Sequence, residues 1–381
     1  MLANRLRSRI RSDGPMPFEE FMAACLYDQE GGFFATGPLR STKDGDFLTS
    51  PEVSPWFGRM LARFVAAEQT RTGATPFRVV EAGAGSGSLL RSLIETLAPS
   101  LPSIPPPQGE VAPARASEGV NPGAGSKPCY EFYAVEASPA ARSAVGGLAG
   151  VERVHESLND LPQRFDGVII ANELLDNLPV ALAIRSGDGW VERWVGATDD
   201  RFGFVTAKAR PDVVTWCEAY AGTVPEGGMV EVQLAAADWV RAALGRIGRG
   251  TLVIIDYGGT AEELEPRRTQ GTLRTYRSHH LGPDPLLEPG ATDVTVDVNF
   301  TAIMAVAEAE GALVELHRQD DFLDDLGLRG VVSELRHRER DLARSGDAMQ
   351  RLIVRSEATD AETLLHPRGL GDFRVMVATK T

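Results

Sequence analysis

The sequence of 381 residues predicts an α/β fold in which helices cover both faces of an open, mostly parallel sheet. Three observations support this prediction. A strand, a glycine turn and a helix follow one another in residues 77–98. A carboxylate, Glu136, ends the next strand-like run. Several later runs, such as VIIA and TLVIID, are continuously apolar, as expected for parallel strands buried on both faces.

The segment FRVVEAGAGSGSLLRSLIETLA has the features of a turn that holds a polar ligand. Glu81 follows an apolar strand, and glycines then recur at alternate positions: Gly83, Gly85 and Gly87. Glycine permits positive φ and lets main-chain N–H groups approach a ligand at the start of a helix. The G-x-G-x-G spacing differs from the G-x-G-x-x-G of dinucleotide sites. It resembles the first motif of class I S-adenosylmethionine (SAM) methyltransferases, and the resemblance implies that these four residues line a SAM site.

A second carboxylate strengthens this interpretation. Such folds place an acidic residue at the end of the next strand, roughly 20 residues on, where it accepts both ribose hydroxyls. Glu136 lies farther along the chain, but the intervening residues 99–128 contain eight prolines and no aromatic residue. This composition is typical of a disordered insertion. Without the insertion the spacing is the usual one, so Glu136 is the candidate ribose ligand.

Composition restricts the partners. The formal net charge of −14 argues against nonspecific binding to nucleic acid, which needs a basic face, and suits a cationic partner. Three scattered cysteines and six histidines show no spacing typical of a disulfide framework or a metal site. No apolar run is long enough to insert into a membrane, and the basic N-terminus lacks a secretory apolar core. We therefore expect a cytoplasmic protein in a bacterium, or a mitochondrial matrix protein in a eukaryote.

Residues 1–75 are predicted to be a helical N-terminal segment that covers the site. Leu2, Leu6 and Ile10 recur every four residues, and PFEEFMAACL is a second amphipathic helix. In the following TSPE, Thr49 and Glu52 have the spacing of a capping box. That structural explanation and a role in the site are equally consistent with the sequence.

Several blocks together resemble the MidA family. They are GDFLTSPEVSPWFG, EAGAGSGSL, ANELLDNLP, IDYG, GTLRTY and PGATDVTVDVNF, in the family's order. The family includes bacterial proteins and a mitochondrial assembly factor of respiratory complex I that is a protein arginine methyltransferase. The resemblance implies SAM as cofactor, a protein substrate with an exposed arginine, and Asp46, Ser50 and Glu52 as substrate or lid residues. Ala82, Ala84 and Ser86 stand where relatives often have Leu, Pro and Arg.

Two loops supply further candidates for the cofactor site. In class I methyltransferases the loop after the third strand contacts the adenine, which here implies Asp160 first and Asn159 second. A turn or cap before Pro162 explains both residues equally well. Asn172, at the end of the fourth strand, lies where open α/β sheets place their ligand crevice.

The same strand end supplies the candidate catalytic residues, Glu173 and Asp176. They are three residues apart, so one helical turn would place both carboxylates on the same face. Paired carboxylates can bind a guanidinium and orient one of its nitrogens. Acidic residues that complement a helix dipole are the competing explanation. Asp256 and Tyr257 end the fifth strand at the same crevice and are secondary candidates.

Residues 76–381 are predicted to be the methyltransferase core, interrupted by a β-rich insertion at about 184–230. His279 and His280 lie in a stretch that could equally be a lid or a surface loop. One charged helix is expected in ELRHRERDLARSGDAMQRLIVR, and DFRVMVATK is the expected last, antiparallel strand. The predicted function is SAM-dependent methylation of protein arginine. Methylation of a small molecule and a weakly catalytic assembly role on the same fold are the alternatives.

Overall fold

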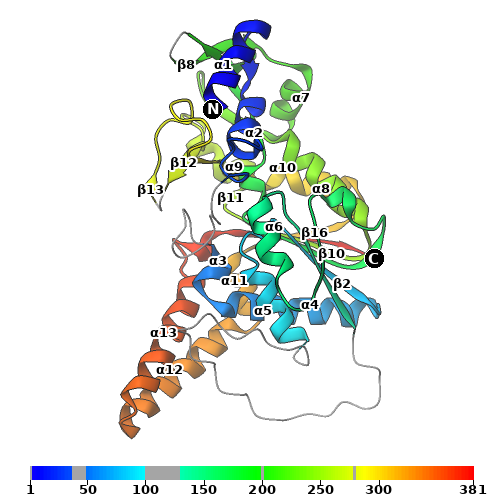
Figure 1. Ribbon diagram of the computed structural model, residues 1–381, viewed down its shortest axis with the longest axis vertical. Coiled ribbons are helices and arrows are strands. Elements are labelled where there is room, and N and C mark those ends of the chain that lie inside the picture. The colour runs from blue at the N-terminus through cyan, green and yellow to red at the C-terminus, as the bar shows by residue number, and fades with distance from the viewer. Residues whose placement is uncertain (1, 37–48, 99–128, 199–200, 278–279) are drawn as a thin grey trace.

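The computed structural model describes residues 2–36, 49–98, 129–198, 201–277 and 280–381 (Figure 1). The candidate residue Asp46, the proline-rich segment 99–128 and His279 lie outside the described residues. His280 is exposed.

A seven-stranded sheet in the order β16-β17-β10-β5-β2-β3-β4 forms the centre of the molecule. Its strands are β2 (Phe77–Ala82), β3 (Tyr130–Val135), β4 (Val151–His155), β5 (Phe165–Asn172), β10 (Ile247–Asp256), β16 (Leu313–Arg318) and β17 (Arg374–Lys380). Five adjacent strands, from β4 to β10, are parallel, whereas β17 runs antiparallel to both β10 and β16. The predicted class I methyltransferase-like fold, with its antiparallel last strand, is confirmed.

Apolar side chains of the central strands alternate between two cores, one on each face of the sheet. In β5, Val168 and Ile170 join one core, whereas Ile169 and Ala171 join the other. The first core includes helices α4 (Pro55–Thr72), α5 (Ser88–Leu97), α6 (Pro139–Gly146) and α11 (Gln319–Asp325), together with one end each of α12 (Leu328–Ser345) and α13 (Ala348–Leu364). The second core includes α8 (Leu234–Arg246) and α10 (Phe300–Ala309). Burial on both faces explains why these strands are apolar throughout.

A second, antiparallel sheet joins the N-terminus to the predicted insertion. Its strands are β1 (Met16–Pro17), β6 (Ala181–Ser186), β7 (Gly189–Ala197), β8 (Phe202–Lys208) and β9 (Met229–Val232). Met16 pairs with Val195, and helices α1 (Leu2–Asp13) and α2 (Phe18–Tyr27) pack against the sheet with their apolar faces. The first helices and the insertion therefore form one unit, at the top of Figure 1.

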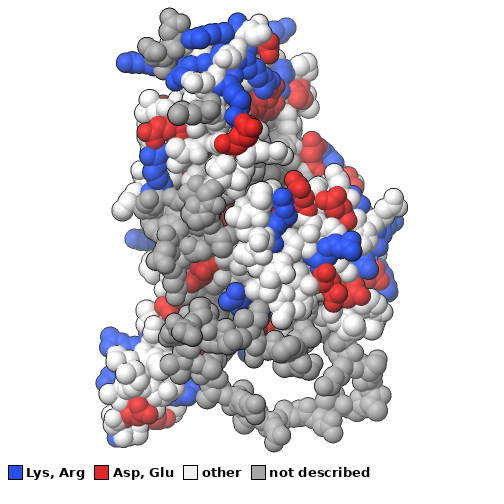
Figure 2. All heavy atoms as spheres, in the orientation of Figure 1, with Lys and Arg blue, Asp and Glu red and all other residues white. Residues whose placement is uncertain are grey.

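Charges on the face shown in Figure 2 are mixed, with basic side chains gathered over this N-terminal unit. In α1, Arg5 pairs with Asp28 and Glu30, and Arg9 pairs with Glu20. These exposed ion pairs contribute little stability individually, roughly 0–1 kcal/mol. They do neutralise much of the positive charge of α1.

The prediction of a single charged helix near the C-terminus is wrong. Two helices, α12 (Leu328–Ser345) and α13 (Ala348–Leu364), form a hairpin that projects from the body (Figure 1). Gly346 has φ 84° and ends α12, because few residues other than glycine adopt that conformation, and Asp347 then caps α13. Charged residues recur on both sides of this turn, so the sequence pattern did not reveal it.

Short elements complete the described chain: α3 (Ser50–Val53), η1 (Leu158–Asp160), η2 (Leu175–Asn177), α7 (Pro211–Tyr220), β11 (Gly258–Gly259), α9 (Ala261–Leu264), η3 (Glu265–Arg267), β12 (Arg274–Arg277), β13 (His280–Leu281), β14 (Asp293–Thr295), β15 (Val298–Asn299) and η4 (Leu370–Asp372). Within the described ranges, no helix has the length and hydrophobicity needed to cross a bilayer.

Candidate active site

The glycine turn joins β2 to α5 at the carboxyl edge of the sheet. Gly83, Gly85 and Gly87 have φ values of 71°, 51° and 77°, a region that other residues rarely adopt. A Cβ atom on Gly87 would lie 2.7 Å from the side chain of Leu148. The turn thus depends on glycine for both its conformation and its packing. Gly83 and Gly85 line a cavity of about 530 Å³ at this edge, whereas Gly87 does not line it.

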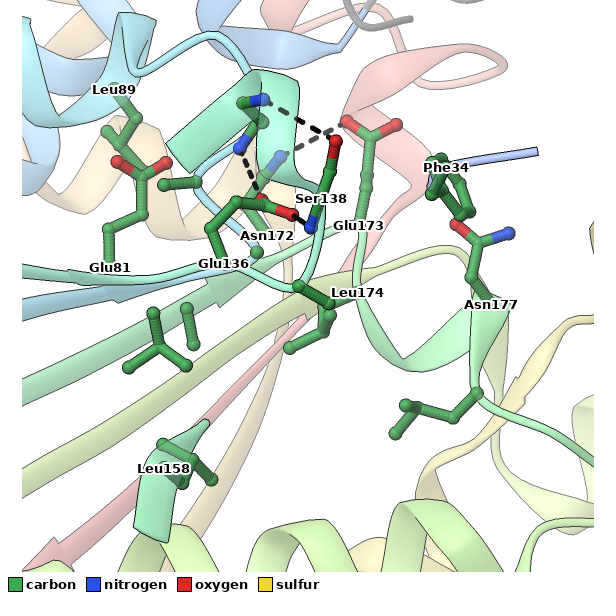
Figure 3. A pocket seen from close by; sticks show the side chains of 18 of the residues that line it. Phe34, Glu81, Leu89, Glu136, Ser138, Leu158, Asn172, Glu173, Leu174 and Asn177 are labelled. Atoms are coloured by element: carbon green, nitrogen blue, oxygen red, sulfur yellow. Dashed lines mark hydrogen bonds between the residues drawn. The ribbon is translucent and has the colours of Figure 1, made fainter. Parts of the chain in front are cut away.

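Glu136 faces the glycine turn from the end of the neighbouring strand β3 (Figure 3). Its Oε2 accepts a hydrogen bond from the N–H of Gly85 at 2.9 Å, and its Oε1 accepts one from the N–H of Ser138 at 2.7 Å. Burial raises the pKa of Glu136 above its usual range, and the two N–H donors oppose that rise. The carboxylate is therefore held rigidly at the cavity wall.

Glu81 also lines the cavity, but its carboxylate has a structural partner. Its Oε2 accepts a hydrogen bond from the N–H of Leu90, in the first turn of α5, at 2.9 Å. Burial, and next the charge of Glu136, raise the pKa of Glu81 well above its usual range. Glu81 thus fixes the helix that follows the turn. The part of Glu81 that lines the cavity could still contact a ligand.

The predicted adenine loop separates its two candidates. Asp160 Oδ2 accepts the N–H of Ser157 at 3.0 Å and completes a capping box on η1, away from the cavity wall. Asn159 lines the cavity, and its Oδ1 accepts a hydrogen bond from Arg246 at 3.1 Å. Leu158 and Trp239 line the same end. The competing interpretation as a cap therefore describes Asp160, whereas Asn159 remains a candidate.

Glu173 occupies the other end of the cavity, past the end of β5 (Figure 3). Its φ is 51°, the one positive value found for a residue other than glycine in the described chain. Its Oε1 accepts hydrogen bonds from the N–H of Ser50 at 3.2 Å and from Asn172 Nδ2 at 3.3 Å. Burial, followed by the nearby charge of Asp176, raises the pKa of Glu173 to about 8.

Asp176 does not share a helical face with Glu173, so that prediction is wrong. Glu173 precedes η2 in a left-handed conformation, whereas Asp176 lies within η2 and is buried behind the cavity wall. Asp176 Oδ2 accepts hydrogen bonds from the hydroxyls of Tyr257 and Thr295, the latter at 2.8 Å. The left-handed residue changes the chain direction, which a helical-periodicity argument cannot anticipate.

Asp256 and Tyr257 lie in the same buried layer, and neither lines the cavity. Asp256 Oδ2 accepts the N–H groups of Leu175 and Asp176 at 3.0 and 3.2 Å and so fixes η2. Burial, and then the charges of Asp176 and Glu173, raise the pKa of Asp256 well above its usual range. These residues position the loop that carries Glu173.

The capping box expected in TSPE is also wrong. Thr49 is the N-cap of α3, but its side chain makes no capping hydrogen bond. Glu52 instead lines the cavity, where its Oε1 accepts hydrogen bonds from the hydroxyls of Ser86 and Ser88, the latter at 2.8 Å. Ser50 is fully buried and contacts Glu173 through its N–H. Tertiary partners thus replaced the local cap.

Three aromatic residues of the cavity wall were missed by sequence reasoning. Tyr27 and Phe34 stack with ring centroids 5.8 Å apart at the end that holds Glu173, and Trp239 of α8 lies at the end that holds Asn159. No local pattern distinguishes an aromatic residue that packs in a core from one that lines a cavity. The aromatic, glycine-rich segment after α2 was the one available signal for Phe34.

The cavity fits an extended ligand with a diol and a positive charge. A rigid carboxylate, Glu136, lies beside glycine backbone that lines the cavity, and Asn172 Oδ1 is buried without a hydrogen-bond partner in the described chain. Five glutamates, at positions 52, 81, 136, 156 and 173, line the wall. Among the described residues no cluster of metal-binding side chains occurs. The residues present are thus suited to a cationic nucleoside such as SAM.

Residues 124–317 match the family described as S-adenosyl-L-methionine-dependent methyltransferases. The Drosophila melanogaster protein named protein arginine methyltransferase NDUFAF7 homolog, mitochondrial, is 28% identical over 322 residues, which cover 81% of this chain and 70% of that protein. The Homo sapiens protein arginine methyltransferase NDUFAF7, mitochondrial, is 25% identical over 339 residues, or 86% of this chain and 73% of that protein.

Solved structures agree with these relatives. The crystal structure of a Burkholderia thailandensis protein bound to S-adenosyl-homocysteine superposes with a TM-score of 0.79 at 29% identity, and the alignment covers 100% of this chain and 92% of that chain. A native crystal structure from the same organism gives a TM-score of 0.78, again at 29% identity, over 100% and 91% of the two chains. S-adenosyl-homocysteine is what remains of SAM after methyl transfer, so the predicted SAM cofactor is confirmed.

Proposed function

The chain belongs to a family of SAM-dependent methyltransferases, and from that premise we propose that it methylates an arginine side chain of a protein substrate. The named relatives are protein arginine methyltransferases, which supports this choice of acceptor. The observation that carries the proposal is Glu173, a strained carboxylate at the end of the cavity opposite the candidate adenine loop.

A strained conformation at a cavity wall indicates a functional constraint. A residue other than glycine with positive φ costs on the order of 1 kcal/mol or more, and such residues cluster at active sites. Here the strain turns the side chain of Glu173 toward the cavity while η2 continues behind it. Both hydrogen bonds found for the carboxylate in the described chain involve Oε1, so Oε2 is available to a substrate.

The chemistry of arginine suits this group. A guanidinium stays protonated near neutral pH and is a poor nucleophile, so it must be oriented and its released proton accepted. A cation beside Glu173 would favour the ionised carboxylate and lower its pKa from about 8. Glu173 would then hold one guanidinium nitrogen in line. Bound SAM supplies a methyl group on a positively charged sulfur.

The balance of the step assigns the proton to Glu173. A nitrogen–carbon bond forms, the sulfur–carbon bond breaks, and the nitrogen loses one proton, which Glu173 Oε2 accepts. Burial raises the pKa of Glu173 in the ligand-free chain, which offsets part of the lowering by the bound cation and makes Glu173 a suitable acceptor. Asp176 supports this role indirectly, since it fixes Tyr257 and Thr295 behind the loop.

The remaining residues of the wall receive roles by position. We assign Glu136 to the ribose hydroxyls, the backbone at Gly83 and Gly85 to the amino-acid part of SAM, and Asn159 to the adenine. Asn172 Oδ1 is the candidate hydrogen-bond acceptor for the ammonium group of SAM. Tyr27 and Phe34 form an apolar wall that would exclude water from the guanidinium.

The test is transfer of label from methyl-labelled SAM into a lysate of cells that lack the gene. Wild type is compared with Glu173→Gln, which keeps the shape of the carboxylate, and with Gly85→Val, which cannot adopt φ 51° without strain. We expect labelled methylarginine in hydrolysed protein with the wild type, and at least a 1000-fold lower rate with Glu173→Gln, about 4 kcal/mol of transition-state stabilisation.

Counting protein and small-molecule fractions separately decides the acceptor. Label confined to small molecules would reject protein arginine as the acceptor and favour a metabolite methyltransferase. Absence of label in both fractions, with SAM binding intact, would favour an assembly protein on the same fold. Wild-type activity in Glu173→Gln would reject the assigned role of Glu173.

A further inference from the structure

The short helix α3 contacts both Glu173 and the glycine turn. At its first residue, the N–H of Ser50 donates to Glu173 Oε1 at 3.2 Å. At its third residue, the carboxylate of Glu52 accepts hydrogen bonds from Ser86 and Ser88, which lie in and just after the glycine turn. A single residue, Pro51, therefore separates the residue that contacts Glu173 from the residue that contacts the glycine turn.

The position of α3 is fixed by burial as well. Ser50 is fully buried, and its hydroxyl accepts a hydrogen bond from Gln319 Nε2 of α11 at 3.4 Å. Glycine at position 58 of α4 lies so close to Ser92 of α5 that a Cβ atom would approach to 2.4 Å, so the two helices that follow α3 and the glycine turn pack tightly. Because α4 and α5 cannot move closer together, a displacement of the glycine turn would also displace α3.

We propose that Glu52 is a positioning residue that couples the cofactor turn to Glu173 through α3. Held by the hydroxyls of Ser86 and Ser88, Glu52 sets the position of α3, and the N–H of Ser50 then holds Glu173 Oε1 so that Oε2 faces the acceptor. A ligand that orders the glycine turn therefore also orders Glu173. This inference rests on the proposed role of Glu173 in binding the acceptor.

Coupling of this kind makes two ligands bind cooperatively. If SAM orders the acceptor carboxylate, an acceptor must strengthen SAM binding by the same factor. The pH dependence of catalysis should follow as well, because the N–H of Ser50 lowers the pKa of Glu173. Loss of that contact would move the acidic limb of the rate profile to higher pH. A residue that only stabilised the fold would leave this limb in place.

The first experiment needs no acceptor. Hydrogen exchange is measured on the full chain with and without S-adenosyl-homocysteine, for wild type, Glu52→Ala and Glu52→Gln, with Glu95→Ala as matched control. Glu95 is an exposed glutamate of α5. We expect the ligand to slow exchange in peptides covering 83–90, 50–54 and 172–176 in wild type and control. In Glu52→Ala the slowing should persist at 83–90, disappear at 50–54 and decrease at 172–176, where only the direct contact of the ligand with Asn172 remains. Glu52→Gln, whose amide oxygen still accepts, should restore it.

Two results would overturn the proposal. Undiminished protection of 172–176 in Glu52→Ala would show that coupling does not pass through Glu52. A loss of ligand affinity of more than about 30-fold would make Glu52 a direct cofactor ligand instead. If Glu52→Ala does not fold, Ser88→Ala, which removes one donor to the same carboxylate, takes its place with the same expectations.

The kinetic test follows where an acceptor is known. At saturating SAM, Glu52→Ala should lower kcat about tenfold, with SAM affinity within threefold of wild type and the acidic limb moved to higher pH. An unchanged pH profile with a parallel loss of kcat and thermal stability would indicate a structural role and reject the proposal. Because hydrogen exchange uses the product alone, its outcome stands even if label transfer finds no methylarginine.

Discussion

Two glutamates of the cavity wall, Glu136 and Glu173, differ in the hydrogen bonds that their carboxylates accept. Glu136 and Glu173 follow the strands that flank β2, and both line the cavity. Glu136 receives one backbone N–H on each oxygen, whereas Glu173 receives both of its donors on Oε1. The carboxylate at the cofactor end is satisfied before any ligand binds. Within the described residues the Glu173 carboxylate uses only Oε1, and the proposed function assigns its Oε2 to a cation.

The surroundings deepen this difference. Glycine backbone that lines the cavity lies beside Glu136. Behind Glu173 lie two buried carboxylates: burial and then the charge of Asp176 raise the pKa of Glu173, and Asp256 has its own pKa raised by burial and by the charges of Asp176 and Glu173. A preorganised carboxylate suits a hydroxyl ligand, which changes no charge. A crowded, buried carboxylate suits a group that binds a cation and then accepts a proton. The two glutamates thus differ in their hydrogen-bond donors and not in residue type, and the roles proposed for them depend on that difference.

Replacing Glu136 should produce the largest effect on the cofactor end. In Glu136→Gln an NH₂ group replaces one of the two carboxylate oxygens. An NH₂ group cannot accept a hydrogen bond, so the N–H of either Gly85 or Ser138 loses its acceptor. We expect SAM and S-adenosyl-homocysteine to bind roughly 30- to 100-fold more weakly, about 2–3 kcal/mol, as measured by titration calorimetry. Glu173→Gln is the matched variant and should bind them within threefold of wild type. Equal losses in both variants would contradict the division between the two ends.

The raised pKa of Glu173 should appear as pH-dependent stability. Because the folded-state pKa is about 8, above the usual 4.5, the folded chain binds this proton more tightly than the unfolded chain. The stabilisation from that proton is present below pH 4.5 and is lost as pH rises through 8. Glu173→Gln keeps the shape and carries no charge, so it should be about 2–4 kcal/mol more stable than wild type at pH 8.5 and similar near pH 4.5.

Urea unfolding of the ligand-free protein at several pH values measures this difference. Glu357→Gln, a change at a partly exposed ion pair with Arg59, serves as the control for removing a glutamate outside the cavity. A Glu173→Gln advantage that stays constant from pH 5 to pH 8.5 would contradict the buried, proton-holding state of Glu173.

The smallest effects are expected at the adenine end. Asn159→Ala removes a wall residue whose side chain Arg246 already engages at the surface, so SAM affinity should fall only about threefold. Asp160→Ala should leave SAM affinity unchanged and lower stability by about 0.5–1 kcal/mol, because it removes a cap on η1. Calorimetry and thermal unfolding measure the pair. A larger affinity loss in Asp160→Ala would reverse the assignment of the two residues.

Patterns local in sequence predicted much of this molecule. The glycine turn, the five parallel strands and the antiparallel last strand follow from apolar runs and from glycine spacing, which depend on neighbouring residues alone. Glu136 was found because strand ends meet at one edge of a parallel sheet. Where a local rule continued across a glycine, as at Gly346, the prediction of one helix was wrong.

By itself, then, the sequence determined the fold, the cofactor edge and the residue types at the crevice. The tertiary structure alone decided which of these side chains face the cavity. Glu173 points inward because a left-handed residue breaks the turn, whereas Asp176 is buried by Tyr257 and Thr295 from distant strands. The carboxylate of Glu52 accepts hydrogen bonds from two serines, Ser86 and Ser88, instead of completing a capping box on its own helix. The reason is physical: a polar side chain takes the partners that packing brings to it, and those partners are not neighbours in sequence.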